Sequence, residues 1–332
     1  MFDFTYLWVA ILGFGLLMYV LADGFDLGVG MLFPFAASED ERDVMMNSVA
    51  PVWDGNETWL ILGGAGLLAA FPLVYAVFLP ALYIGVFLLL AGLIFRGVAF
   101  EFRFKASAKG KPMWNLAFTL GSLVATFAQG AVVGAYIQGF ETENMRYVGG
   151  AFDWLTPFTV MTGLGLVAGY SLLGATWLVL KTEGELQQRM RRWSVRLLAV
   201  VMGFFVMVSL WTPQMDAYVH DRWFGNLSWL WVLPTATVIV AALIWRALVR
   251  GREASPFIGT IVLFGLFYGG LLFSKWPYVV PPNHTFHDAA SAPESQLFLL
   301  VGVLFVIPFV LMYTAWTYYV FRGKVKMGVG YH

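Results

Sequence analysis

Long apolar runs constrain this chain more than any other feature of its sequence. Nine of them cover residues 6–33, 52–74, 77–100, 114–139, 156–180, 194–212, 228–249, 256–274 and 297–321. Because a helix rises 1.5 Å per residue, about 20 apolar residues cross the ~30 Å hydrocarbon core of a bilayer. Of the 332 residues, 60% are apolar and only 12% are charged, so we predict an all-α polytopic membrane protein with nine transmembrane helices.

The segments between the runs are too short to form a soluble domain. We therefore expect residues 1–332 to form a single integral membrane domain, in which eight helices make two four-helix bundles and the ninth is peripheral. The start of the chain has neither the basic segment nor the small-residue cleavage site of a secretory signal, so the first run is expected to remain as a helix.

The distribution of basic residues predicts the orientation. With the N-terminus outside, sixteen of the twenty Lys and Arg residues fall on the inner side, while Arg146, Arg222 and Lys275 fall outside and Arg96 lies within the third run. Loops rich in Lys and Arg stay in the cytoplasm, so the N-terminus is expected outside and the C-terminus in the cytoplasm. Acidic and basic residues balance, and nothing in the composition indicates a nucleic-acid partner.

Glycine pairs at i, i+4 spacing recur within the runs. The pairs are Gly24 with Gly28, Gly130 with Gly134, Gly165 with Gly169, and Gly265 with Gly269. Small residues at this spacing let helix backbones approach closely in a membrane. They predict a closely packed bundle.

Six charged residues lie inside or beside the first three runs. They are Asp23 and Asp26 in the first, Asp54 and Glu57 in the second, and Arg96 and Glu101 in the third. At 1.5 Å per residue, all six reach the cytoplasmic rim of the bundle. Each of the first two pairs has i, i+3 spacing and so shares a helical face. One arginine cannot neutralise five acids, so we expect some of the acids to be protonated or hydrated.

Three interpretations of these charges remain open from the residues alone. Carboxylates within membrane spans are usual parts of proton relays, which favours a proton-conducting cluster open to the cytoplasm. A purely structural subunit would use the same acids as clamps on Arg96, with Asp54 and Glu57 near the positive end of a helix dipole. A proton-coupled secondary transporter would also place acids near glycines, although its substrate site should lie near the midplane.

Histidine and cysteine indicate which metals the chain can bind. The sequence has no cysteine, and its four histidines, His220, His284, His287 and His332, all fall outside the runs. A haem or copper centre in a membrane normally takes histidine from a helix. We therefore expect this chain to bind no metal by itself.

Several motifs resemble subunit II of the cytochrome bd-type quinol oxidases. They are Ala22–Met31 (ADGFDLGVGM), Asn47–Trp59 (NSVAPVWDGNETW), Phe95–Arg96 and Gly174–Leu186, and Tyr313–Tyr318 is similar to the end of that family's last helix. The resemblance covers essentially the whole chain. Glu57 and the short chain resemble the cyanide-insensitive branch.

The resemblance implies a multi-pass subunit of the bacterial inner membrane that forms a heterodimer with a haem-bearing subunit I. The partner would carry two b-type haems, a d-type or b-type third haem, and the quinol site. The complex would oxidise quinol, reduce O2 to water with protons taken from the cytoplasm, and build a proton gradient without pumping. A small single-helix subunit is left open as a third member.

The resemblance also implies roles for individual residues. Asp54 and Glu101 resemble acids of a cytoplasmic proton path leading to the haems of subunit I. Asp23, Asp26 and Arg96 match charged positions around that path. Trp53 resembles a position beside a structural quinone bound in some members.

Overall fold

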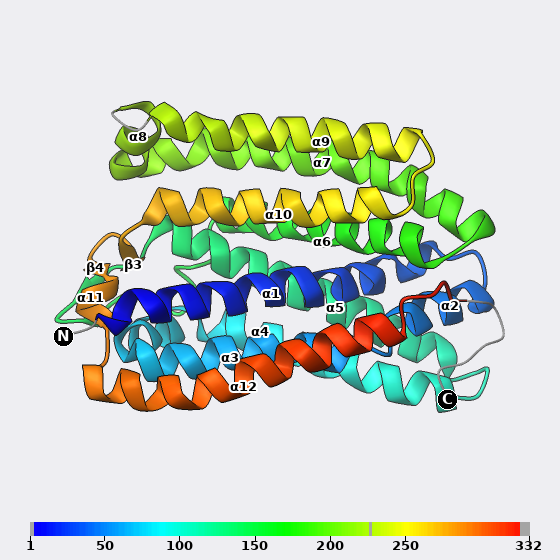
Figure 1. Ribbon diagram of the computed structural model, residues 1–332, viewed down its shortest axis with the longest axis horizontal. Helices are drawn as coiled ribbons and strands as arrows, with labels where there is room; N and C mark the ends of the chain where they lie inside the picture. The colour runs from blue at the N-terminus through cyan, green and yellow to red at the C-terminus, as the bar shows by residue number, and fades with distance from the viewer. Residues whose placement is uncertain (1–2, 226–227, 326–332) are drawn as a thin grey trace.

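The computed structural model describes residues 3–225 and 228–325, so His332 lies outside the described residues. Long helices dominate the fold (Figure 1). They are α1 (Phe4–Leu32), α3 (Trp53–Ala70), α4 (Pro72–Lys105), α5 (Lys111–Gln138), α6 (Pro157–Lys181), α7 (Gly184–Met215), α9 (Val232–Val249), α10 (Ala254–Lys275) and α12 (Pro293–Val320). Within the described ranges, eight helices are long and apolar enough to cross a membrane. The all-helical, polytopic character of the chain is therefore confirmed.

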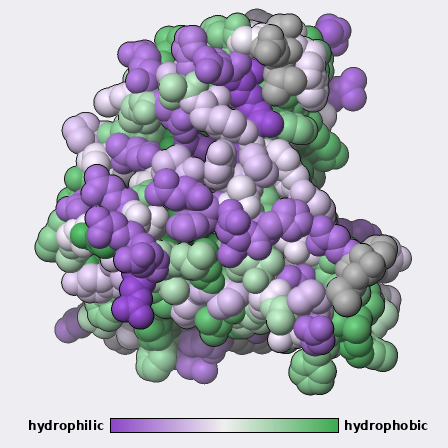
Figure 2. Space-filling model, turned by 90° about the vertical axis from the view of Figure 1, so that its left-hand side faces the viewer, coloured by the Kyte–Doolittle hydropathy of each residue, from purple (hydrophilic) through white to green (hydrophobic). Residues whose placement is uncertain are grey.

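Shorter elements lie at the two ends of the long helices (Figure 1). They are η1 (Phe33–Phe35), α2 (Glu39–Val49), β1 (Thr142–Glu143), β2 (Arg146–Tyr147), α8 (Ala217–Phe224), η2 (Ser228–Trp231), β3 (Tyr278–Val280), β4 (His284–Thr285) and α11 (Phe286–Ala289). β1 pairs with β2 and β3 with β4, both antiparallel. We call the two ends of the bundle the α2 end and the α11 end. The face at the α11 end is rich in hydrophilic side chains (Figure 2), as expected of a surface outside the bilayer core.

The second and third helices differ in their limits from the predicted runs 52–74 and 77–100. α3 ends at Ala70 and α4 begins at Pro72, so Phe71 alone separates them. Proline suits the first turn of a helix, where its missing N–H leaves no bond unmade. α4 continues to Lys105, because Arg103 and Lys105 in its last turn suit the negative end of the helix dipole.

The long helices form two neighbouring groups of four, with α12 beside the first. α1, α3, α4 and α5 form the first group, and α6, α7, α9 and α10 form the second. The second group shares a core that includes Leu172, Leu198, Ile244 and Leu263. α12 lies along α3 and α1 (Figure 1). A core that includes Phe25 of α1 and Leu178 of α6 joins the two groups.

Glycine permits the close contact between α1 and α6. A Cβ atom on Gly28 would lie 1.9 Å from the carbonyl oxygen of Tyr170, and one on Gly174 would lie 2.4 Å from the carbonyl carbon of Gly28. A Cβ on Gly130 would likewise lie 2.7 Å from the carbonyl oxygen of Thr162. The backbones of the packed helices therefore do approach closely at these positions. It does not extend to Gly265 or Gly269, whose Cβ positions have nothing within 4 Å among the described residues.

The Gly28 contact predicts a large effect of one methyl group. We expect Gly28→Ala to destabilise the fold by about 3 kcal/mol, because overpacking between two backbones cannot be relieved by a side-chain rotation. The measurement is the thermal unfolding midpoint of the purified protein. Gly63→Ala is the matched control, because its Cβ would meet nothing within 4 Å in the described structure. Equal midpoints for the two variants would contradict the packing argument.

Candidate functional site

Arg96 of α4 is the centre of a buried charge cluster. Its guanidinium donates from Nη1 to Asp23 Oδ1 of α1 at 2.5 Å, and its Nη2 lies 3.2 Å from Glu57 Oε2 of α3. The Arg96 and Asp23 side chains are fully buried, whereas Glu57 is 24% exposed. One cation therefore joins three helices, and one of its two partners reaches the surface.

Several polar atoms of the cluster lack hydrogen-bond partners among the described residues. Asp23 Oδ2, Asp26 Oδ1 and Arg96 Nε are buried and unpaired. Arg96 Nη2 is close to Glu57 without the alignment of a hydrogen bond. Buried polar atoms are normally hydrogen-bonded, and exceptions often mark functional sites. A static clamp would be expected to pair these atoms more completely.

Asn56 connects the cluster to α12. Its Nδ2 donates to Asp26 Oδ2 at 2.7 Å and to the Ala22 carbonyl at 3.3 Å, while Tyr318 donates from its hydroxyl to Asn56 Oδ1 at 2.9 Å. A neutral amide thus fixes Asp26 between α1, α3 and α12. The sequence analysis missed Asn56 because it considered only ionisable residues, although its position between Asp54 and Glu57 is a visible signal.

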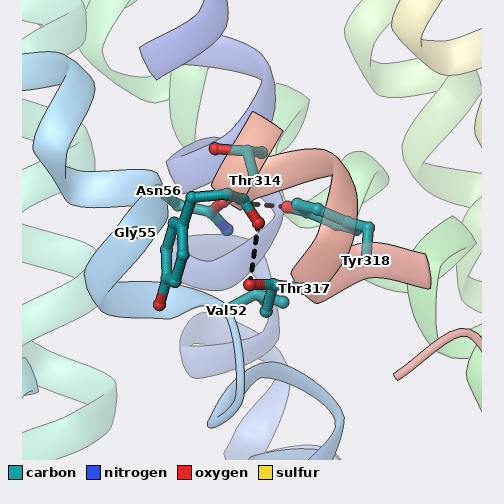
Figure 3. Close-up of a pocket in the computed structure, with 7 residues that line it drawn as sticks. Val52, Gly55, Asn56, Thr314, Thr317 and Tyr318 are labelled. Carbon is teal, nitrogen blue, oxygen red and sulfur yellow. Dashed lines mark hydrogen bonds between the residues drawn. The ribbon is translucent and has the colours of Figure 1, made fainter. Parts of the chain in front are cut away.

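A small cavity adjoins this amide (Figure 3). Its volume is about 10 Å³, close to the space that one water molecule needs. The lining residues are Val52, Gly55, Asn56, Tyr313, Thr314, Thr317 and Tyr318. Thr314 Oγ1 is buried there without a partner among the described residues. The cavity is polar enough to hold a water between α3 and α12.

A second amide lies beyond Asp23 on the side of the α11 end. Gln129 donates from Nε2 to the Tyr19 hydroxyl at 2.9 Å and accepts from the Tyr170 hydroxyl at 3.0 Å. Tyr19 precedes Asp23 by one turn of α1. All three side chains are neutral, so the charge cluster gives way here to a neutral hydrogen-bonded layer. The sequence analysis did not identify this layer.

Asp54 and Glu101 lie outside the cluster, contrary to the expectation that all five acids converge. Asp54 is exposed, and Glu101 is 59% exposed with Lys105 at 3.8 Å. Glu101 follows Arg96 by five residues, which is about 140° around a helix, so the two side chains leave α4 in different directions. The structure brings together Asp23, Asp26, Glu57 and Arg96.

A second buried cation lies at the α2 end. Arg103 is fully buried and donates to Asp43 Oδ1 at 2.5 Å, to Glu39 Oε2 at 2.9 Å and to Asn115 Oδ1 at 2.5 Å. Lys111 lies 3.4 Å from Asp43 Oδ2. This cluster holds α2 against α4 and α5. The sequence analysis counted Arg103 as a loop charge because it ended the helix at residue 100.

The residues after α12 are held by α6 and the start of α10. Lys181 donates to the carbonyls of Phe321 and Gly323, and Lys324 lies 2.9 Å from Glu253 Oε2. Hydrogen bonds from Lys324 and Gln187 hold the pKa of Glu253 below its usual range. The end of α12 is therefore fixed beside the second group of helices.

Trp53 is engaged in packing. Its ring stacks on Phe100 with centroids 4.8 Å apart and planes inclined by 10°. A Cβ on Gly97 would lie 3.5 Å from the same indole. Phe100 therefore occupies the place over one indole face that a quinone ring would need.

The histidines that the structure describes belong to short elements and not to the long helices. His220 is in α8, His284 in β4 and His287 in α11. Within residues 3–225 and 228–325, no group of three or more His, Cys, Asp or Glu side chains could hold a metal ion. None of the three described histidines could therefore supply a haem ligand from within a long helix.

Comparison with known proteins identifies the family of this chain. A family model described as cytochrome bd terminal oxidase subunit II matches residues 4–321. The chain belongs to this family. It is 30% identical to cytochrome bd-I ubiquinol oxidase subunit 2 of Escherichia coli strain K12, over 96% of this chain and 94% of that protein. It is also 30% identical to cytochrome bd ubiquinol oxidase subunit 2 of Bacillus subtilis strain 168, over 98% and 96% of the two chains.

A solved structure shares the fold of this cytochrome bd subunit. The bd oxidase from Geobacillus thermodenitrificans includes a chain that superposes with a TM-score of 0.79, covering 95% of this chain and 96% of the other at 17% identity. The two-group arrangement of helices is therefore a fold already seen in a bd oxidase. The side-chain contacts described above are those of the present chain.

The buried ion pair predicts that two cations on α4 contribute very differently to the stability of the protein. We expect Arg96→Gln to destabilise the protein by about 3–5 kcal/mol, because it leaves Asp23 buried beside no cation. Lys105→Gln should cost less than about 1 kcal/mol, because Lys105 and Glu101 are exposed. Thermal unfolding of the purified proteins measures both, and similar midpoints would contradict the role of Arg96 as the central cation.

Proposed function

We propose that the chain delivers protons from the cytoplasm to the haem-bearing subunit of a cytochrome bd-type quinol oxidase, besides supporting that subunit. The chain is a component of such an oxidase by family. The observation that carries the proton role is the cluster of Asp23, Arg96 and Glu57, in which two members are buried and the third reaches the surface of the bundle. Carboxylates in membrane spans commonly relay protons.

Nine crossings, with the N-terminus outside, are part of this proposal. α1 ends at Leu32, close to α2, whereas α4 begins at Pro72, close to Ser291, whose N–H bonds the Ala70 carbonyl at 2.9 Å. α3 therefore connects the α2 end to the α11 end, although its polar N-terminal turns keep it out of the eight helices that are apolar enough to cross a membrane by composition. Its 18 residues span about 27 Å. The excess of basic residues at the α2 end favours the cytoplasm on that side.

The surface around Glu57 is the proposed contact with the partner subunit. Ile61, Gly64 and Leu68 follow Glu57 at i+4, i+7 and i+11 and so lie on one face of α3. Ile61 is 69% exposed, and a Cβ on Gly64 would meet nothing within 4 Å among the described residues. An apolar stripe with an open glycine suits a closely packed helix of another subunit. A proton leaving Glu57 on this face would enter the haem-bearing partner.

The proposed route begins at exposed acids and ends at Glu57. Asp54 lies one turn before Glu57 at the α2 end, and Glu101 is exposed near the same end. Either carboxylate can take a proton from the cytoplasm and pass it on through water. Arg96 stabilises the ionised form of Glu57 between transfers, and Asp23 keeps Arg96 in place. Asp26 is held in place beside the pair by Asn56.

The competing functions receive less support from the geometry. A secondary transporter would bind its substrate near the midplane between broken helices, whereas α1, α3 and α4 are continuous at the cluster. A purely structural clamp would not require the unpaired Asp23 Oδ2 and Arg96 Nε. The neutral Gln129 layer also separates the cluster from the α11 end, which suits uptake from one side.

Two implications of the family resemblance receive less support: the quinone beside Trp53 and the assignment to the cyanide-insensitive branch. The stacked Phe100 supports a packing role for Trp53 on that face of the indole. The two ubiquinol oxidase relatives are equally 30% identical, so they do not bear on the cyanide-insensitive branch. Glu57 nevertheless makes that branch the one we propose.

The proton role predicts the effect of neutralising Glu57. In the assembled oxidase we expect Glu57→Gln to lower quinol-driven O2 consumption at least tenfold at unchanged haem content, because an amide cannot exchange the proton. Glu57→Asp should recover part of the rate. Glu185→Gln is the control, since Glu185 is exposed at the start of α7. A fully assembled Glu57→Gln oxidase that turns over at the rate of the Glu185→Gln control would overturn the proposal.

The partner contact predicts a separate result. We expect Gly64→Leu to prevent co-purification of the haem-bearing subunit, because the added side chain points out of this chain into the proposed interface. Gly203→Leu on α7 is the matched control, because its Cβ also meets nothing within 4 Å in the described structure. Equal recovery of haem with the two variants would place the partner on another face.

A further inference from the structure

Five arginines at the α2 ends of α7 and α9 have no acidic partner among the described residues. They are Arg192, Arg196, Arg246, Arg250 and Arg252. All five are exposed. Elsewhere at this end, cations such as Arg42, Arg103 and Arg189 pair with acids of α2. The second group of helices therefore carries a local excess of positive charge.

Contacts between α7 and α9 keep these cations on one part of the surface. Arg191 of α7 donates to the carbonyls of Leu248 at 3.2 Å and Arg252 at 3.0 Å. It thereby ties the first turns of α7 to the C-terminal end of α9. The two helices lie side by side at the edge of the molecule opposite α12 (Figure 1).

Each helix continues from its arginines into an exposed stripe. On α7, Arg192 and Arg196 are followed at helical spacing by Val200 and Met207, which are 47% and 45% exposed. Gly203 lies between them, with nothing within 4 Å of its Cβ position in the described structure. Gly203 therefore leaves a shallow depression in the stripe, next to the arginines of α7.

The matching stripe on α9 runs from Arg250 and Arg246 to Leu243 and Ile239, which are both 55% exposed. Leu198 of α7 and Ile244 of α9 instead point into the core shared with α6 and α10. Residues two apart on a helix differ by about 200° in direction, so Arg196 and Arg246 point away from this core. Both stripes thus face out of the bundle.

We propose that the α2 ends of α7 and α9 bind the phosphate of an anionic diacyl phospholipid, whose acyl chains lie along the two apolar stripes. Guanidinium groups donate paired hydrogen bonds to phosphate oxygens, and basic residues between helix ends are typical sites for anionic headgroups. A soluble anion would use the arginines but not the stripes. The lipid would bind on the edge of the subunit that is remote from the proposed partner contact.

The test uses the assembled, delipidated oxidase in detergent and measures retained lipid by native mass spectrometry. Phosphatidylglycerol and phosphatidylcholine with identical acyl chains are added separately. We expect phosphatidylglycerol to bind with the higher affinity and Arg196→Gln/Arg246→Gln to weaken its binding about 30-fold, since each cation near the surface contributes about fivefold. Neither substituted residue belongs to the proposed proton route, so O2 consumption should not change.

Three comparisons decide the result. Lys105→Gln/Lys109→Gln removes the same charge from another part of the α2 end, and it should leave phosphatidylglycerol affinity within about twofold. Equal weakening by both double variants would show a general charge effect and overturn the proposal. Equal binding of the two lipids, or full competition by glycerol 3-phosphate without acyl chains, would overturn it as well.

Discussion

A guanidinium that is removed from water must be neutralised by carboxylates, and most of the first group of helices is arranged around that requirement. Arg96 is fully buried, so α1 and α3 must bring Asp23 and Glu57 to it. Removing either partner of such a pair leaves an uncompensated charge at a cost of several kcal/mol. The same requirement keeps Glu57 at the boundary between the bundle and its surface. The structural need and the proposed proton chemistry therefore share one cluster.

The surrounding residues limit where the charge can move. Asn56 and Gln129 are amides with fixed donor and acceptor sides, and each is held by a tyrosine hydroxyl. An amide holds a carboxylate or a phenol in place, but it does not readily exchange protons as a carboxyl group does. The surface side of Glu57 is thus the natural direction for transfer. Arg103 plays a different part, because its acids belong to α2 and fix that helix across the α2 end.

Apolar run length predicted the helical, membrane-spanning architecture, because it reflects a bilayer constraint that acts on every segment. The pairing of Asp23 and Glu57 with Arg96 could also be predicted from the sequence, since few charges lie in those spans. The prediction for Glu101 failed because it ignored helical phase: an offset of five residues turns Glu101 about 140° away from Arg96 around α4. Asn56, Gln129 and Arg103 were missed because neutral amides carry no charge signal and because the predicted third helix ended too early.

The central claim is that protons consumed at the partner's haems pass through the Arg96 cluster. The most direct measurement mixes fully reduced, assembled oxidase with O2 and follows proton uptake from the medium with a pH-indicator dye, while haem absorption reports oxidation. The account predicts that Asp23→Asn slows proton uptake at least tenfold although the first O2-binding step is unchanged. Uptake at the unmodified rate in an oxidase with full haem content would contradict it.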